Sequence, residues 1–200
     1  MKRKLFILLN VFMFIACKNN EFQKEEQRTY EVISFIINEL STPFPPAPPP
    51  PGLSDNEFKQ QKDSIQEVFS KKIENVQLDV AVYPVMKPVK FDFDKYKDFI
   101  DVKKKPNIDE VLPLDVIKIN NYKEHRLAYF DTLAKRKIVD NQFDISIQIS
   151  RIVFNENYNK ALLIASSGRG KLDGSRSLYI LERDENGLWS IIYKDLLSIS

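Results

Sequence analysis

The residues best suited to chemistry gather in one stretch, 166–176, with the sequence SSGRGKLDGSR. This stretch holds three of the five glycines, three hydroxyl side chains and three cations. Backbone N–H groups freed by glycine, together with cationic side chains, can bind an anion such as a phosphate or a carboxylate. A strand pattern follows instead of a helix, so the stretch is not a P-loop. We expect either a solvated hairpin connection or an anion- or partner-binding loop formed by Gly168, Arg169, Gly170, Lys171 and Arg176.

Other candidates for catalysis are few. His125 is the only histidine, and it lies between cations in the sequence KEHR. No Gly-x-Ser-x-Gly elbow presents a nucleophilic serine, so we interpret His125 as a surface residue in preference to a catalytic base. Asp92 and Asp94 alternate in FDFD, and paired carboxylates are typical of glycosidases and calcium loops, but the calcium-loop spacing is absent. We therefore predict no catalytic residue, no metal ligand and no cofactor.

The charge balance depends on where the mature chain begins. The full sequence carries 30 basic and 28 acidic residues, and residues 1–16 hold three of the basic ones and no acidic one. Without residues 1–16 the balance becomes 27 basic against 28 acidic residues. Bulk charge then gives no argument for a nucleic-acid partner. The three lysines at 103–105 are most simply a solvated loop, and contact with anionic headgroups is the alternative.

An amphipathic helix is predicted over residues 22–40, because six apolar side chains share one stripe at helical spacing. Packing of the stripe on the domain core is the first interpretation, and a helix lying on a bilayer is the alternative. The polar face carries four glutamates, whereas interfacial helices prefer lysine and arginine there. The six residues of the stripe are Phe22, Tyr30, Ile33, Ile36, Ile37 and Leu40.

Residues 43–52 are rich in proline, which fixes φ and removes the backbone donor, so they predict a polyproline II segment. The segment is interpreted as a stiff spacer or strap, with a ligand for an aromatic-lined groove as the alternative. We divide the chain into a signal peptide at 1–16, a tether at 17–29, the helix and proline-rich strap at 30–52, and one α+β domain at 53–200.

Local patterns mark the elements of that domain. Ser54 and Glu57 form a capping box ahead of a helix over residues 55–72, and a strand follows before Pro84. A short helix at 94–101, a strand starting near 116–119 and a strand at 127–130 are the weaker expectations for the middle of the chain.

The C-terminal third predicts an antiparallel meander over residues 143–195. Strands are expected at 145–149, 161–165, 178–181 and 188–193, with a bulge near Ser150 and Arg151 where the apolar phase shifts. The run 161–165 is apolar throughout, as expected of a central strand covered on both faces. Gly187 supplies a positive φ in the last turn. The predicted fold class is α+β, with N-terminal helices packed on one face of the meander.

The N-terminus has the form of an export signal. Lys2, Arg3 and Lys4 precede a twelve-residue apolar segment that is too short to span a membrane and ends at Ala16 before Cys17. This segment resembles a bacterial lipoprotein signal, although Phe14 stands where leucine is usual. The resemblance implies lipidation of Cys17 on sulfur, cleavage before it and acylation of the new N-terminus. It also implies permanent anchoring, since one acyl chain holds marginally and several hold stably.

Two further expectations follow from Cys17. Lys18 stands where aspartate favours inner-membrane retention in Gram-negative systems, so the outer membrane is the favoured location. Cys17 is also the only cysteine, which excludes intrachain disulfides and cysteine-based metal sites.

The meander resembles a pattern found in small uncharacterised lipoproteins of Gram-negative bacteria. The resemblance rests on the stretches 150–155, 161–165, 168–174 and 187–191, the last of which has the form Gly-x-Trp-x-Ile. It implies no activity and assigns no functional residue.

The first functional hypothesis is a non-enzymatic lipoprotein of the cell envelope that is anchored by lipid and presents the meander face or the 166–176 loop to an envelope protein or glycan. One alternative is a small hydrolase of the envelope that uses carboxylates or a serine. The other is an inhibitor or immunity-type lipoprotein that holds a toxin at the membrane.

Overall fold

The computed structural model describes residues 22–43, 49–52, 54–73, 76–102, 109–130, 143–169 and 173–199. The predicted signal peptide, the predicted lipidation site Cys17, residues 44–48 of the proline-rich strap, the lysines at 103–105, and Gly170 and Lys171 lie outside these ranges. Among the described residues, no helix combines the length and the apolar character needed to cross a membrane.

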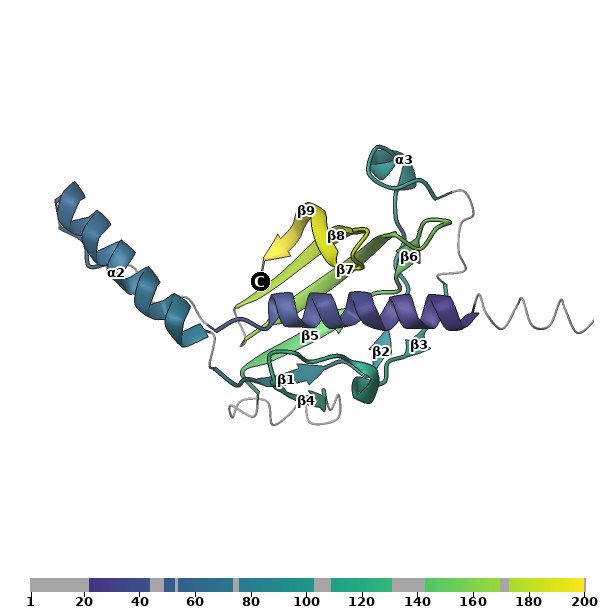
Figure 1. Cartoon of the computed structure of the whole chain (residues 1–200), viewed down its shortest axis with the longest axis horizontal. Coiled ribbons are helices and arrows are strands. Elements are labelled where there is room, and N and C mark those ends of the chain that lie inside the picture. Colours follow the sequence, from purple (N-terminus) through teal and green to yellow (C-terminus); the bar gives the residue numbers. More distant parts are fainter. Residues whose placement is uncertain are drawn as a thin grey trace, which may run out of the picture.

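A mixed β-sheet forms the centre of the described structure (Figure 1). Its strands follow the order β4-β1-β5-β7-β8-β9, and β6 pairs with β7. Strand β1 lies between β4 and β5 and is parallel to both, whereas β5, β7, β8 and β9 pair antiparallel. The α+β class is confirmed. The bounds are β4 (Arg126–Tyr129), β1 (Asp79–Val82), β5 (Ile145–Ile149), β6 (Val153–Phe154), β7 (Lys160–Gly168), β8 (Gly174–Arg183) and β9 (Trp189–Ile199).

The C-terminal strands follow the local patterns closely. The pairing with β7 shifts by one residue between Ile149 and Val153, which is the expected bulge near Ser150 and Arg151. Residues 161–165 of β7 are buried at every position, as expected of a strand covered on both faces. Gly187 has a φ of +88° in the turn before β9, and a side chain there would be strained.

The helix at residues 22–40 lies across the strands (Figure 1) and includes residues 22–29, the part assigned to a tether. Its buried side chains Val32, Ile33, Ile36 and Ile37 share one core cluster with residues of β1, β5, β7 and β8. The apolar stripe is therefore covered by protein and is not available to a bilayer. Phe22, at the start of the predicted stripe, is exposed.

The opposite face of the sheet is covered by the segment around α3 (Phe93–Tyr96), the short form of the helix expected at 94–101. Tyr96 and Ile100 pack there with Leu162 and Ile164 of β7. Lys95 reaches β9 through an ion pair with Asp195 at 3.0 Å. Because alternate residues of β7 point to opposite faces, the sheet has two separate apolar layers.

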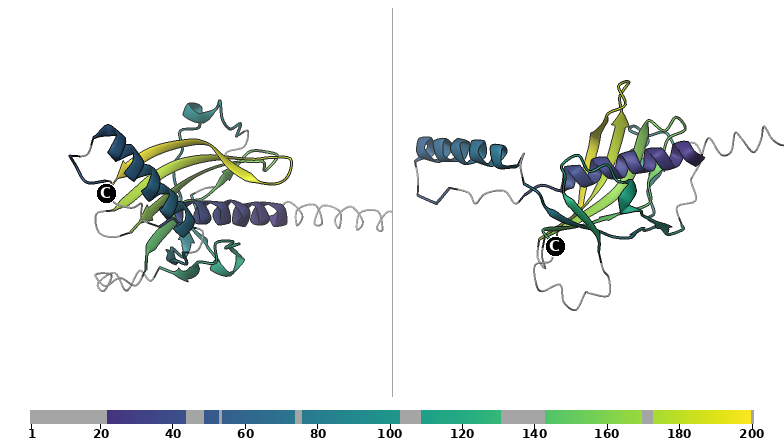
Figure 2. Two further views of the ribbon diagram at one scale, coloured as in Figure 1. Left: turned by 60° about the vertical axis from the view of Figure 1, so that its left-hand side comes forward. Right: turned by 60° about the horizontal axis from the view of Figure 1, so that its bottom comes forward.

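Helix α2 (Asp55–Ile73) projects away from the sheet (Figures 1 and 2). The Glu57 half of the capping box is present, because the Glu57 carboxylate accepts hydrogen bonds from the backbone N–H of Ser54 at 3.1 Å and from its hydroxyl at 2.6 Å. The apolar side chains Phe58 and Val68 are exposed. Of the two N-terminal helices expected to pack on the sheet, the helix at 22–40 does so, and this packing is not confirmed for α2.

One segment that the sequence predicts as a strand is a short helix in the structure. Residues near 116–119 form the 3₁₀ helix η1 (Val116–Lys118), because the Asp115 carboxylate accepts a hydrogen bond from the N–H of Ile117 at 3.0 Å and caps the turn. A two-stranded sheet of β2 (Val85–Met86) and β3 (Leu112–Pro113) precedes it.

Candidate functional site

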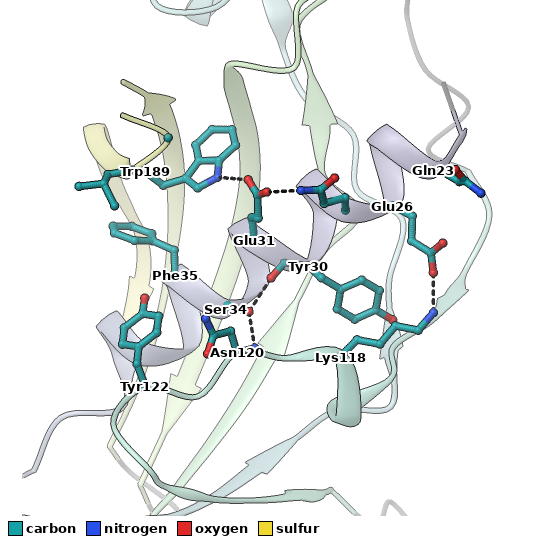
Figure 3. A pocket seen from close by; sticks show the side chains of 13 residues that line it. Gln23, Glu26, Tyr30, Glu31, Ser34, Phe35, Lys118, Asn120, Tyr122 and Trp189 are labelled. Atoms are coloured by element: carbon teal, nitrogen blue, oxygen red, sulfur yellow. Dashed lines mark hydrogen bonds and ion pairs between the residues drawn. The ribbon is translucent and has the colours of Figure 1, made fainter. Parts of the chain in front are cut away.

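The largest cavity described lies between the helix at 22–40, the segment after η1 and the turn before β9 (Figure 3). Its volume is about 850 Å³. The helix contributes seven lining residues, η1 and the segment after it three, and the turn with the first residue of β9 three: Gln23, Glu26, Gln27, Tyr30, Glu31, Ser34, Phe35, Lys118, Asn120, Tyr122, Gly187, Leu188 and Trp189. We call this cavity the aromatic cleft, because four of its residues carry aromatic rings.

Glu31 is the most highly coordinated side chain of the aromatic cleft. It accepts hydrogen bonds from Gln27 at 3.0 Å, from Arg28 at 2.7 and 2.6 Å, from Arg183 at 3.2 Å and from the Trp189 indole at 3.2 Å. Burial alone would raise its pKa, but the hydrogen bonds from Arg28 and Trp189 and the charges of Arg28 and Arg183 outweigh burial and lower it. Glu31 is therefore ionised at neutral pH, so it positions Trp189 and does not supply a proton.

The side of the aromatic cleft facing η1 is held by polar contacts to the helix. Ser34 Oγ donates to the Tyr30 carbonyl at 2.6 Å and accepts from the Asn120 N–H at 2.8 Å. The ammonium group of Lys118 pairs with Glu26 at 2.6 Å. Figure 3 shows these side chains around the cavity mouth. These bonds fix the helix and the segment after η1 at one separation, so the cavity is preformed.

The turn before β9 forms the other side of the aromatic cleft. Asp184 Oδ1 accepts from the Leu188 N–H at 2.7 Å, and the Asp184 carbonyl accepts from the Gly187 N–H at 3.1 Å. Arg183 and Trp189 are opposite partners in the β8–β9 pair, so both side chains point to the helix face, where Glu31 binds them. The turn thereby sets Leu188 at the rim and Trp189 in the wall.

The rings and the rim make the aromatic cleft suited to an apolar group. Tyr122 is 57% exposed and Leu188 is 68% exposed at its rim, next to the half-buried rings of Tyr30 and Phe35. Tyrosine and tryptophan supply large apolar contact area at low entropic cost and are enriched at protein–protein interfaces. The geometry can therefore bind an aliphatic, aromatic or prolyl side chain.

His125 is not the surface residue that the sequence predicts, because its side chain is only 6% exposed. Its Nδ1 accepts from the Leu78 N–H at 3.2 Å, which places the proton on Nε2, and Nε2 lies 3.1 Å from the Ser41 carbonyl. Burial lowers the pKa of His125, and the Ser41 carbonyl opposes this shift. Both ring nitrogens are used by the chain's own backbone, so His125 joins β1 to the end of the helix and is not arranged as a base.

The predicted anion-binding residues separate in the structure. Strands β7 and β8 extend to Gly168 and Gly174, so most of the expected loop is strand. The guanidinium of Arg169 donates to the Thr42 carbonyl and, at 3.1 Å, to Thr42 Oγ1. Gly168 and Arg176 line one cavity of about 260 Å³, whereas Gly170 and Lys171 lie outside the described residues.

Asp92 and Asp94 line none of the three cavities described here. In the described part of the chain, no three histidine, cysteine, aspartate or glutamate side chains are arranged to hold a metal ion.

The residues of the aromatic cleft were not predicted as a site. Glu31 appeared only as part of the polar helix face, Phe35 lay off the apolar stripe, and Trp189 appeared only in a strand pattern. The sequence offered only indirect evidence for this cavity. Phe35 is an aromatic residue outside the apolar stripe of its helix, and Leu188 is an apolar residue next to the turn glycine Gly187. The chain matches no protein-family model, and neither a curated protein nor a solved structure is significantly similar to it.

Proposed function

We propose that this chain is a non-enzymatic lipoprotein of the cell envelope, anchored by lipid at Cys17, that binds an apolar segment of an envelope protein in the aromatic cleft. The observation that carries the proposal is the preformed cavity of about 850 Å³ with exposed Tyr122 and Leu188 at its rim. Exposed apolar side chains around a concave site are characteristic of protein-interaction surfaces.

Two polar groups, the half-buried Glu31 and the buried His125, favour binding over catalysis. Glu31 accepts bonds from two arginines and an indole, and His125 is hydrogen-bonded to backbone through both nitrogens. Neither group can exchange a proton with a substrate without breaking these contacts, so nothing observed supports a hydrolase that uses them. The packing of the helix at 22–40 in the core is compatible with a domain that stands on a membrane and does not embed this helix in it.

The lipid anchor would place the aromatic cleft near the bilayer. Cys17 precedes residue 22 by five residues, which can span at most about 18 Å. Gln23 and Glu26, at that end of the helix, line the cleft. A partner that is itself at the membrane surface would therefore meet the cleft at a high effective concentration.

Photo-crosslinking tests this proposal. p-Benzoylphenylalanine is placed at Tyr122 in the full chain, expressed with its signal in a Gram-negative host that carries the partner. We expect one discrete crosslinked protein after irradiation. Leu188→Glu puts a charge at the apolar rim and should abolish this product.

Leu196→Glu is the matched control, because Leu196 on β9 is also an exposed leucine at 53% and does not line the aromatic cleft. It should leave the crosslink unchanged. Products that consist only of phospholipid, or a crosslink that resists Leu188→Glu, would refute the proposed protein partner.

A further inference from the structure

A row of polar side chains crosses the sheet on the face opposite the helix at 22–40. Gln148, Ser166, Arg176 and Ser198 are consecutive cross-strand partners from β5 to β9. Directly opposed residues of antiparallel strands point to the same face. Because Ile147 and Ile149 pack in the core beneath the helix, Gln148 between them points to the other face. The four residues therefore form one polar row, which we call the Arg176 row.

The sheet is hollowed beside the Arg176 row. Gly168 of β7 pairs with Gly174 of β8, and these two positions carry no side chains over adjacent strands. A cavity of about 260 Å³ lies there, bounded by Tyr83 and Ser146, and a second of about 300 Å³ adjoins it on the side of Lys87. Gln148, Ser166 and Arg176 line both cavities, so the two form one groove along the row.

The described lining of the groove offers hydrogen-bond donors and no acidic side chain. Gln148 Nε2 is buried and has no hydrogen-bond partner among the described residues. Across the described ranges, the Arg176 side chain forms no ion pair or hydrogen bond. Within the part of the chain that the structure describes, no aspartate or glutamate lines either cavity, whereas hydroxyls, an amide and the cations Arg176 and Lys87 do. A buried donor without a partner costs stability, so its presence needs a compensating role.

We propose that this groove is a binding site for a carboxylate group of a small organic acid. The Arg176 guanidinium would hold both carboxylate oxygens in its planar fork, and Gln148 Nε2 would donate to one of them. The hydroxyls and the half-buried ring of Tyr83 would contact the body of the acid. The 260 Å³ cavity contains one cation among neutral donors, which matches a planar monoanion better than a phosphate dianion.

This site is independent of the aromatic cleft. The two lie on opposite faces of the sheet and share no lining residue. It also differs from the loop site that the sequence predicts, because Arg169 is bound to Thr42, and the residues common to both cavities, Gln148, Ser166 and Arg176, lie in strands. Of the predicted anion-binding residues with described positions, Gly168 and Arg176 belong to the groove.

The test is an NMR titration of the ¹⁵N-labelled mature domain with acetate, D-glucuronate and inorganic phosphate, each at matched ionic strength. We expect saturable shifts for acetate and glucuronate at the backbone amides of Ser146, Ser166 and Arg176. Arg176→Gln should weaken binding by about tenfold or more, because a charge-assisted pair of bonds is lost. Lys59→Gln, which removes an exposed cation from α2, should leave binding unchanged.

The variant Gln148→Leu distinguishes binding at this groove from nonspecific electrostatic attraction of anions to the protein. It leaves the net charge unchanged and should weaken acetate binding severalfold, while raising the Tm because an unpaired buried amide is removed. Unchanged binding in Gln148→Leu or Arg176→Gln would overturn the proposal. Tighter binding of phosphate than of both carboxylates, or shifts spread over exposed lysines, would overturn it as well.

Discussion

His125 couples the fold to pH through a neutral, buried imidazole. Its pKa is lowered from the ordinary value of 6.5, chiefly by burial, while Lys123 lowers it further and Ser41 and Asp144 oppose the shift. Between the native and the unfolded pKa, only the unfolded chain binds a proton at this site. The free energy of unfolding should therefore fall as pH decreases through the window immediately below 6.5.

His125→Gln tests this coupling, because the glutamine amide can still donate to the Ser41 carbonyl but does not titrate. The variant should lose about 1–2 kcal/mol at pH 8, since the bond from Leu78 is lost, and should show a flatter pH dependence between about pH 5.5 and 7. Urea unfolding across this range measures both quantities. An equal slope in the two proteins would mean that the pH dependence arises from other groups.

Sequence patterns select a residue by its type but do not give its partner. Arg176 and Gly168 were selected for charge and backbone freedom, and both line the groove opposite the helix. Arg169 was selected on the same grounds and contacts Thr42, a residue more than a hundred positions earlier in the chain. Alternation along a strand tells which face a side chain occupies, but no local pattern tells which distant segment passes over that face.

Replacing Gly187, in the turn between β8 and β9, should lower the free energy of unfolding more than replacing Gly52, which also has a positive φ. Gly187 has a φ of +88°, and a Cβ added there would lie 2.6 Å from Arg183 Nη2. Gly187→Ala should cost about 2–3 kcal/mol, because backbone strain is joined by displacement of Arg183 from Glu31. Chemical unfolding followed by the fluorescence of Trp189, the single tryptophan, measures the loss.

Gly52→Ala is the matched control for that loss. Gly52 has a φ of +95° with nothing within 4 Å of the added Cβ, so only the strain of about 1 kcal/mol is expected. Equal losses in the two variants would show that Arg183 adapts without cost to Glu31.

Elements that depend on residues adjacent in the sequence were predicted well. The order and direction of the strands in the sheet were not. The contacts of Glu57 with Ser54 at the start of α2 and the bulge after β5 depend on a few adjacent residues, and both are present. The parallel insertion of β1 between β4 and β5 depends on long connections, which alternation does not encode. α2 has an apolar stripe at helical spacing, but Phe58 and Val68 remain exposed, because periodicity indicates a face and not what covers it.

At the scale of the molecule, one sheet carries cavities of different chemical character on its two faces. The helix at 22–40 covers one face and forms the aromatic cleft with η1 and the last turn. The other face carries the Arg176 row beyond the apolar cluster around α3. A domain held at a membrane by one end could engage two ligands at once, since the sites share no residue.

The proposed anchor at Cys17 would act together with the aromatic cleft, and this can be tested. Cys17→Ser should abolish incorporation of a palmitate analogue and move the chain from the membrane fraction to the soluble fraction, or leave it unprocessed. Asn19→Ser, two residues further along, should change neither. Unaltered processing and anchoring in Cys17→Ser would refute the lipoprotein assignment.

The same variant should also weaken partner capture without touching the aromatic cleft. Release from the bilayer removes the effective concentration gained by confinement, so the crosslink from Tyr122 should fall steeply in Cys17→Ser even though Leu188 and Trp189 are intact. Lys18→Asp supplies the complementary case, because it should keep the lipid but shift the protein from the outer to the inner membrane on density-gradient separation. A crosslink that survives Lys18→Asp but not Cys17→Ser would place the partner at both membranes. A crosslink lost in both would confine the partner to the outer membrane.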